Sequence, residues 1–148
     1  MTAAGPLLRV ENLSRVFRSG DSDLVVFSDL NLEVARGERL AIVGESGAGK
    51  STLLHLLGAL DRPSTGAIYF ELRSLSELTD SQLAEFRNRE VGFVWQIHYL
   101  LPEFTALENV SMPLLIRGQG RREAAAEASK WLAEVGLAGR ASHRSGEL

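Results

Sequence analysis

The 148-residue sequence contains no cysteine, which excludes disulfide scaffolds, thiolate metal sites and cysteine nucleophiles. Lysine is scarce, since only Lys50 and Lys130 are found among the 16 basic residues. No apolar run reaches the ~18–20 residues of a membrane span, and the first residues lack the pattern of a signal peptide. We therefore expect a cytoplasmic protein that meets a membrane only through a partner.

The remaining composition is that of an ordinary globular protein, with 45% hydrophobic and 24% charged residues. This excludes a disordered or low-complexity chain. A length of 148 residues allows one domain. The formal net charge of −3 argues against a dedicated nucleic-acid binder. We therefore expect a single domain, residues 1–148, that binds no nucleic acid.

The first half of the chain has the hydrophobic pattern of a sheet protein. Apolar and polar residues alternate over 7–17 and 24–34, and the turn-forming residues between them predict an antiparallel hairpin. Three further short apolar segments, 39–43, 67–70 and 91–95, predict strands, of which the first and last resemble strands covered on both faces.

Helices are predicted by caps and by periodicity. Thr79 with Gln82 and Thr105 with Glu108 form two capping boxes, each opening a helix. Pro113 should kink or restart the second of these helices. A last helix is predicted over 121–135 and ends at Gly136, and its predicted buried face consists of Ala124, Ala128, Trp131, Leu132 and Val135.

One motif carries a specific chemistry. Gly44 is followed after four residues by Gly49, Lys50 and Ser51, the phosphate-loop pattern, and it lies between a predicted strand and an apolar run, 53–60, that suits a helix. Backbone N–H groups of such a loop wrap a phosphate, and the dipole of the following helix adds to them. Lys50 would contact the β- and γ-phosphates, Ser51 would bind Mg²⁺ and Thr52 would reach the α-phosphate. The predicted ATP-binding residues here are Gly44, Glu45, Ser46, Gly47, Ala48, Gly49, Lys50, Ser51 and Thr52.

Several blocks of the chain resemble the ATP-binding subunit of ABC transporters. They include 10–17, Gly37-Glu38, the phosphate loop 44–52, 63–66, Gln96 and 107–110. The likeness is closer to the lipoprotein-releasing (LolD-type) subfamily, through 53–58, 60–61, 96–98, 100–110, 112–115 and 143–144. The resemblance implies an α/β phosphate-loop NTPase fold: an antiparallel β subdomain, a partial RecA-like core and the start of a helical subdomain.

The resemblance also implies roles for particular residues. Phe17 matches the aromatic residue that stacks on adenine, and Gln96 matches the glutamine that senses Mg²⁺ and the γ-phosphate. Residues 96–110 match the surface that receives transmembrane permease subunits. The implied ligands are ATP and Mg²⁺, with Ser51 and Gln96 at the metal. The implied location is the inner face of the bacterial inner membrane, where a second ATPase subunit completes a dimer.

The hydrolytic half of such an ATPase is missing from the sequence. Catalysis needs an apolar strand ending in Asp for Mg²⁺, followed in this family by Glu as the base. No aspartate follows Asp80. In the LolD-type pattern Leu148 would be the first signature residue, so we expect a domain truncated at the start of the signature. We expect no catalytic residue in this chain, and no activity from it alone.

Three functional hypotheses remain at this stage. The first is the ATP-binding part of an ABC transporter ATPase that hydrolyses ATP and energises lipoprotein release, or of another exporter in the same group. The second is a non-hydrolytic nucleotide-binding fragment. The third, a small phosphate-loop kinase, fits less well because about forty residues precede the loop and no arginine-rich lid is visible.

Overall fold

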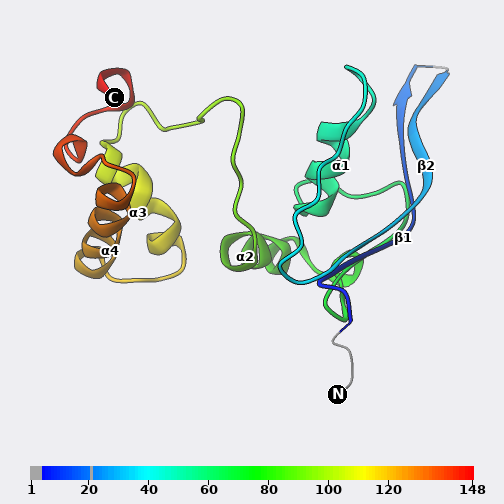
Figure 1. The fold of residues 1–148 in the computed structure, drawn as a ribbon, viewed down its shortest axis with the longest axis horizontal. Helices are drawn as coiled ribbons and strands as arrows, with labels where there is room; N and C mark the ends of the chain where they lie inside the picture. The colour runs from blue at the N-terminus through cyan, green and yellow to red at the C-terminus, as the bar shows by residue number, and fades with distance from the viewer. Residues whose placement is uncertain (1–4, 21) are drawn as a thin grey trace. The chain divides into compact units, whose positions relative to one another are not determined.

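A computed structural model describes residues 5–20 and 22–148, apart from the side chain of Ser19. The chain divides into two compact units, Met1–Arg87 and Asn88–Leu148. Figure 1 shows the elements of each unit. In the described part of the chain, no helix is long and apolar enough to cross a membrane.

The first unit is built on a four-stranded antiparallel sheet with the order β2-β1-β3-β4. The strands are β1 (Leu8–Ser19), β2 (Ser22–Val34), β3 (Thr65–Phe70) and β4 (Arg73–Ser74). The helix α1 (Lys50–Leu57) lies between β2 and β3 in sequence, and the 3₁₀ turn Leu75–Glu77 leads to α2 (Asp80–Glu90). The hairpin predicted from 7–17 and 24–34 is confirmed, and so is the strand predicted over 67–70, which is β3.

Apolar side chains from the sheet and the helices form the core of this unit. Phe70 of β3 meets Phe86 of α2 edge-on, with ring centroids 5.1 Å apart. The other buried side chains include Val10, Leu13 and Ile68 from the sheet, Leu53 and Leu56 from α1, and Leu83 from α2. Alternation along the strands therefore buries one face of the sheet, as the sequence predicts.

The central strand β1 is irregular where it passes β3. The pairing of β1 with both neighbours shifts near Asn12, whose φ of 47° is left-handed. The Asn12 N–H donates to the side-chain oxygen of Asn31 on β2 at 3.0 Å. Gly66 of β3 lies directly against this irregularity, because a Cβ at Gly66 would be 2.3 Å from the Asn12 carbonyl oxygen.

The second unit consists of α3 (Ala106–Ile116), α4 (Arg121–Glu134) and the 3₁₀ turns Ala138–Arg140 and Ser145–Glu147. Ala124 and Ala128 of α4 are fully buried, and such small residues let two helices approach closely. The final residues return to the start of α3, since Ala106 N–H donates to the His143 carbonyl at 2.8 Å and Leu107 N–H to that of Ala141 at 3.0 Å.

Both predicted capping boxes are present. Thr79 N–H donates to the Gln82 side chain at 2.9 Å, and Gln82 N–H donates back to the Thr79 hydroxyl at 3.3 Å. Thr105 and Glu108 make the same reciprocal pair. Hydrogen bonds from the Thr105 backbone and then its hydroxyl hold the pKa of the Glu108 carboxyl below its usual range.

The end of α4 also follows the prediction. Gly136 has a left-handed φ of 78°. Its N–H donates to the Ala133 carbonyl at 3.0 Å, and Leu137 N–H donates to that of Leu132 at 2.7 Å. This is the Schellman arrangement, in which a left-handed residue lets the chain satisfy the last helical carbonyls.

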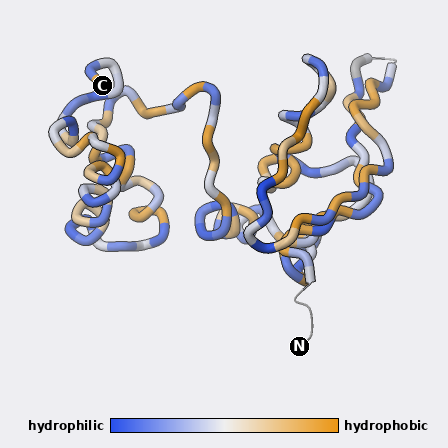
Figure 2. The backbone as a smooth tube through the Cα atoms, viewed as in Figure 1, coloured by the Kyte–Doolittle hydropathy of each residue, from blue (hydrophilic) through white to orange (hydrophobic). Residues whose placement is uncertain are grey.

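Two predicted strands are wrong. Residues 39–43 and 91–95 form no strand in the structure. Val43 is 88% exposed and Val94 is fully exposed, although both segments are hydrophobic (Figure 2). A β-ladder needs a hydrogen-bonded neighbour, and neither segment has one among residues 5–20 and 22–148.

Two smaller expectations about helices are met only in part. α3 continues through Pro113 as one helix, so the restart that was one of the two outcomes expected there does not occur. On α4, Ala124, Ala128 and Leu132 are buried as predicted, but Trp131 is 53% exposed and Val135 is exposed. The buried strip is therefore narrower than the hydrophobic pattern suggests, because the alanines face α3 and the larger residues lie to one side of them.

Candidate nucleotide-binding site

The predicted phosphate loop is a turn of left-handed glycines ending at a helix. Gly47 and Gly49 have φ values of 82° and 84°, which only glycine adopts without strain. Gly49 is the residue before α1, and no side chain caps that helix. The first N–H groups of a helix have no partner within the helix. They are therefore available to an anion, and the helix dipole favours one.

Gly49 is required for a second reason, because there is no space for a side chain beside β2. A Cβ on this residue would lie 2.4 Å from Cγ1 of Val26 and 3.4 Å from Cδ1 of Phe27. The strand β2 therefore abuts the loop at the point where α1 begins. This contact fixes the phosphate loop to the antiparallel sheet.

The Lys50 ammonium lies over its own loop. Its Nζ donates to the carbonyl oxygens of Gly44 at 2.8 Å and Glu45 at 2.6 Å. The charge is thus held beside the first-turn N–H groups of α1, where a bound phosphate would also be drawn. The loop is closed by a bond from Ala48 N–H to the Glu45 carbonyl at 3.3 Å.

The other loop residues lie where the sequence places them. Ser51 is exposed in the first turn of α1, and Thr52 is half-buried beside it. Glu45, Ser46 and Ala48 are exposed on the loop. In the described part of the chain no three His, Asp or Glu side chains gather to hold a metal. The exposed Ser51 hydroxyl fits Mg²⁺ held mainly by phosphates and water, as this ion prefers.

Phe17 lies near the end of β1 and is 39% exposed. It pairs with Leu24 on β2, two residues before the Val26 that touches Gly49. Two residues of strand span about 7 Å. The hairpin that carries the Phe17 ring therefore also contacts the phosphate loop, through Val26.

The Arg15 guanidinium covers the Phe17 ring, with Cζ 4.4 Å from the ring centroid. The same guanidinium donates to the Asp61 carboxylate at 2.6 Å and to the Arg62 carbonyl at 2.7 Å. The role of Arg15 is not among those predicted from the sequence. Its position two residues before Phe17 on a strand was the available signal, because such residues share a face.

Gln96 belongs to the second unit and is exposed in the segment that follows 91–95. Aromatic residues flank it in sequence: Phe93 stacks on Trp95 with centroids 5.0 Å apart, and Trp95 meets Tyr99 edge-on at 5.8 Å. Phe17 and the phosphate loop lie in the first unit. The structure therefore gathers the loop residues at one place, while Gln96 is carried by the other unit.

The sequence profile of the ABC transporter family matches residues 27–148. The chain belongs to the ABC transporter family. The match begins within β2 and includes the whole phosphate loop. The α/β phosphate-loop fold expected from the sequence is thereby confirmed.

Curated relatives narrow the likeness within the ABC transporter family. The lipoprotein-releasing system ATP-binding protein LolD of Koribacter versatilis is 63% identical over 136 residues, which cover 92% of this chain and 61% of that protein. LolD of Chromohalobacter salexigens is 54% identical over 142 residues, covering 96% and 60%. The chain thus spans about three-fifths of the length of the curated relatives it matches.

A solved structure of this family also resembles the chain. The ATP-binding cassette MJ0796, determined as a dimer in a post-hydrolysis state bound to ADP and Pi, aligns with a TM-score of 0.87 and 32% identity. The alignment covers 95% of this chain and 62% of that one. The protein in that structure therefore carries both products of ATP hydrolysis on a related fold.

Asn109 of α3 lies within the segment 96–110 singled out by the resemblance, but its role in shaping that segment follows only from the structure. Its side-chain oxygen accepts from Leu101 N–H at 2.9 Å. Its amide nitrogen lies within hydrogen-bond distance of three carbonyl oxygens, which share its two N–H groups: those of Leu101 at 3.1 Å, Phe104 at 3.2 Å and Thr105 at 3.0 Å. In this ABC family member Asn109 therefore holds the loop 101–105 closed. No sequence signal distinguishes it from an ordinary helical asparagine.

Proposed function

We propose that the full-length protein is the ATP-binding subunit of a lipoprotein-releasing ABC transporter and hydrolyses ATP on the inner face of the bacterial inner membrane. The observation that carries this proposal is the loop of left-handed glycines before α1. It occurs in a chain 63% identical to a LolD protein. The likeness to LolD supports lipoprotein as the cargo and a lipoprotein-releasing permease as the partner. The phosphate loop supports ATP as the nucleotide.

In this proposal MgATP binds with its phosphates at the start of α1. Lys50 leaves the loop carbonyls and pairs with the β- and γ-phosphates, which are better acceptors because they are charged. Thr52 donates to the α-phosphate. The Ser51 hydroxyl would hold a Mg²⁺ ion, which would neutralise charge on the phosphates. The proposed role of Gln96 at this ion rests on the family resemblance alone.

Replacing Phe17 with alanine should weaken ATP binding by roughly 5- to 150-fold, since stacking of a base on an aromatic ring contributes about 1–3 kcal/mol. Binding of inorganic tripolyphosphate, which has no base, should not change. Both affinities can be measured by calorimetric titration in the presence of Mg²⁺. Phe17→Tyr is the control, because it keeps the ring face. If Phe17→Ala loses affinity for ATP and for tripolyphosphate equally, Phe17 does not stack on the base.

We propose that the segment 96–110, which ends in the first turns of α3, is the surface that binds the transmembrane permease subunits. Tyr99 is 68% exposed, and Leu101 and Phe104 are also exposed. Asn109 gives this segment a fixed shape through four hydrogen bonds. An ordered loop with exposed apolar side chains suits a protein interface, because little ordering entropy is lost on binding.

Replacing Asn109 with alanine should weaken binding of the full-length protein to its permease by about tenfold, because the loop 101–105 loses its anchor. MgATP affinity should be unchanged. Co-purification and surface binding assays measure the first quantity, and titration measures the second. Asn31→Ala removes a similarly bonded amide from the sheet and should leave permease binding intact. A tenfold loss of permease binding in Asn31→Ala as well would refute a specific role for Asn109.

The transport function itself is tested by reconstitution. The full-length protein, with the lipoprotein-releasing permease from the same genome, should release lipoproteins from proteoliposomes in an ATP-dependent manner. ATP hydrolysis would need a second copy of the ATPase subunit, as in the dimeric MJ0796 structure. If the protein drives transport with the permease of a different exporter and not with the lipoprotein-releasing permease, it is the ATPase subunit of that other exporter.

A further inference from the structure

The Phe17 ring is held in place by a cation. The Arg15 guanidinium lies over one face of the ring at 4.4 Å, within the range at which a cation is attracted to an aromatic face. The Arg15 side chain is only 17% exposed, whereas Phe17 is 39% exposed. The guanidinium is therefore the buried partner, and the ring is the accessible one.

Arg15 is in turn fixed from two sides. One Nη donates to the Asp61 carboxylate at 2.6 Å and the other to the Arg62 carbonyl at 2.7 Å. The second oxygen of Asp61 accepts from the Arg62 N–H at 2.7 Å, so both carboxylate oxygens are engaged. A planar guanidinium with several bonds has little freedom.

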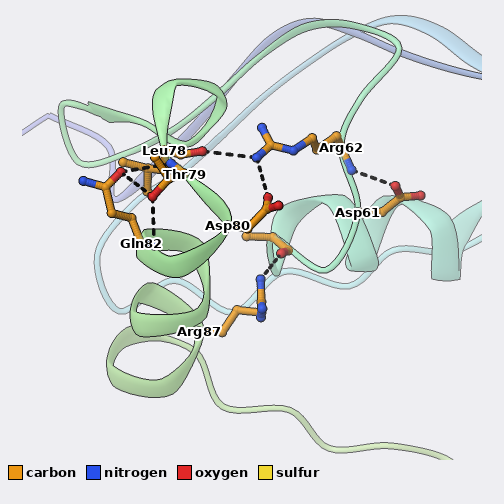
Figure 3. A network of polar contacts seen from close by, with 8 residues as sticks. Asp61, Arg62, Leu78, Thr79, Asp80, Gln82 and Arg87 are labelled. Atoms are coloured by element: carbon orange, nitrogen blue, oxygen red, sulfur yellow. Dashed lines mark hydrogen bonds and ion pairs between the residues drawn. The ribbon is translucent and has the colours of Figure 1, made fainter.

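The anchor of Arg15 belongs to a larger network, drawn in Figure 3. Arg62 donates to the Leu78 carbonyl at 3.2 Å and to Asp80 at 2.9 Å. Arg87 of α2 donates to the Ala59 carbonyl at 2.8 Å, just after α1. The segment that follows α1 is therefore tied to α2, and through Asp61 it also fixes Arg15.

We propose that Arg15 is a positioning residue for the nucleobase: it occupies one face of Phe17 and presents the opposite face to adenine. This inference rests on the proposed role of Phe17 as the stacking residue. A half-exposed ring that is already held in one rotamer loses less entropy when a base stacks on it. Bound adenine then completes a stack of guanidinium, ring and base. The bond to Asp61 keeps the Arg15 guanidinium in place when the nucleotide binds or leaves.

The test compares ATP with inorganic tripolyphosphate, both with Mg²⁺, on single and double variants of the protein. Arg15→Met should weaken ATP binding by roughly 3- to 10-fold and leave tripolyphosphate affinity unchanged. In a Phe17→Ala background, Arg15→Met should have no further effect, because the ring it positions is gone. Arg15→Lys keeps the charge but not both anchors, so its ATP affinity should be intermediate.

Arg9 supplies a matched control on the same strand. Its guanidinium lies over the Tyr69 ring at 4.5 Å, away from the phosphate loop, and it pairs with Glu11 at 2.6 Å. Arg9→Met should therefore leave both affinities unchanged. If Arg15→Met is too unstable to purify, Arg15→Lys and Asp61→Asn, which weakens the anchor, carry the same comparison.

The outcomes separate this inference from the function it rests on. An Arg15→Met protein with unchanged ATP affinity, beside a weakened Phe17→Ala protein, would overturn the role of Arg15 and keep that of Phe17. Equal loss of ATP and tripolyphosphate in Arg15→Met, or additive effects in the double variant, would also overturn it. If Phe17→Ala binds ATP and tripolyphosphate with the same relative affinities as the unaltered protein, the proposed stacking site itself is wrong.

Discussion

Replacing Lys50 with alanine should abolish measurable MgATP binding and leave the fold intact. In the structure its Nζ donates to the carbonyls of Gly44 and Glu45 in its own loop. Losing these half-exposed bonds costs little stability. A hydrogen bond to a charged group contributes about 1.5–3 kcal/mol. Lys50 would make at least two such bonds to phosphates, so affinity should fall by at least about 100-fold.

Titration calorimetry measures this loss, and circular dichroism with thermal melting checks the fold. Lys130 is the only other lysine of the chain and lies exposed on α4, so Lys130→Ala is the matched control and should bind MgATP normally. MgATP should raise the melting temperature of the control but not that of Lys50→Ala. Undiminished ATP binding by Lys50→Ala would end the assignment of the phosphate loop.

Replacing Gly66 with alanine should cause a large loss of stability. The φ of Gly66 is +85°, which costs a residue with a Cβ about 1–2 kcal/mol. The new Cβ would also lie 2.3 Å from the Asn12 carbonyl oxygen and 2.5 Å from that of Glu11. These are backbone atoms, so no side chain can move aside, and a further ~1–3 kcal/mol is expected.

The combined loss of about 2–5 kcal/mol is a large share of the 5–15 kcal/mol that stabilises a typical domain. Urea unfolding followed by circular dichroism measures it. Gly37 has a similar φ of +79°, but a Cβ on Gly37 would meet no atom within 4 Å. Gly37→Ala therefore isolates the backbone strain and should lose about 1 kcal/mol. Equal losses in the two variants would show that the close approach of β3 to β1 carries no cost.

Features encoded by neighbouring residues could be predicted from the sequence. The two capping boxes need only a Thr and an acceptor three residues later, and both formed. The end of α4 at Gly136 needs only a glycine after the last turn. The phosphate loop is likewise a local pattern, because its left-handed glycines and its helix are contiguous.

Features that depend on distant partners could not be predicted in this way. The segments 39–43 and 91–95 have the composition of covered strands, yet a strand exists only where another strand pairs with it. Trp131 lies within the helical periodicity of α4 but outside the strip that the other helix covers. Hydropathy alone does not set the width of that strip.

The candidate site likewise contains residues that could be predicted from local sequence and residues that could not. The loop residues 44–52 were recognisable from their spacing, because one motif carries all of them. Arg15 was not, since its meaning depends on Asp61, which lies 46 residues away in sequence. Asn109 was not either, because the chain must fold back on α3 before its amide meets the carbonyls of Leu101 and Phe104.

The central place of β1 in the sheet has a consequence for the order in which the protein is made. β1 pairs on one side with β2, the next strand in the chain, and on the other with β3, where even Ser14 and Thr65 are more than fifty residues apart. Closing a short loop costs less entropy than closing a long one, so the hairpin should form while β3 is still being synthesised. The phosphate loop lies between β2 and β3 in sequence. The loop therefore leaves the ribosome after the hairpin, and a nascent chain should acquire its hairpin before it can hold a nucleotide.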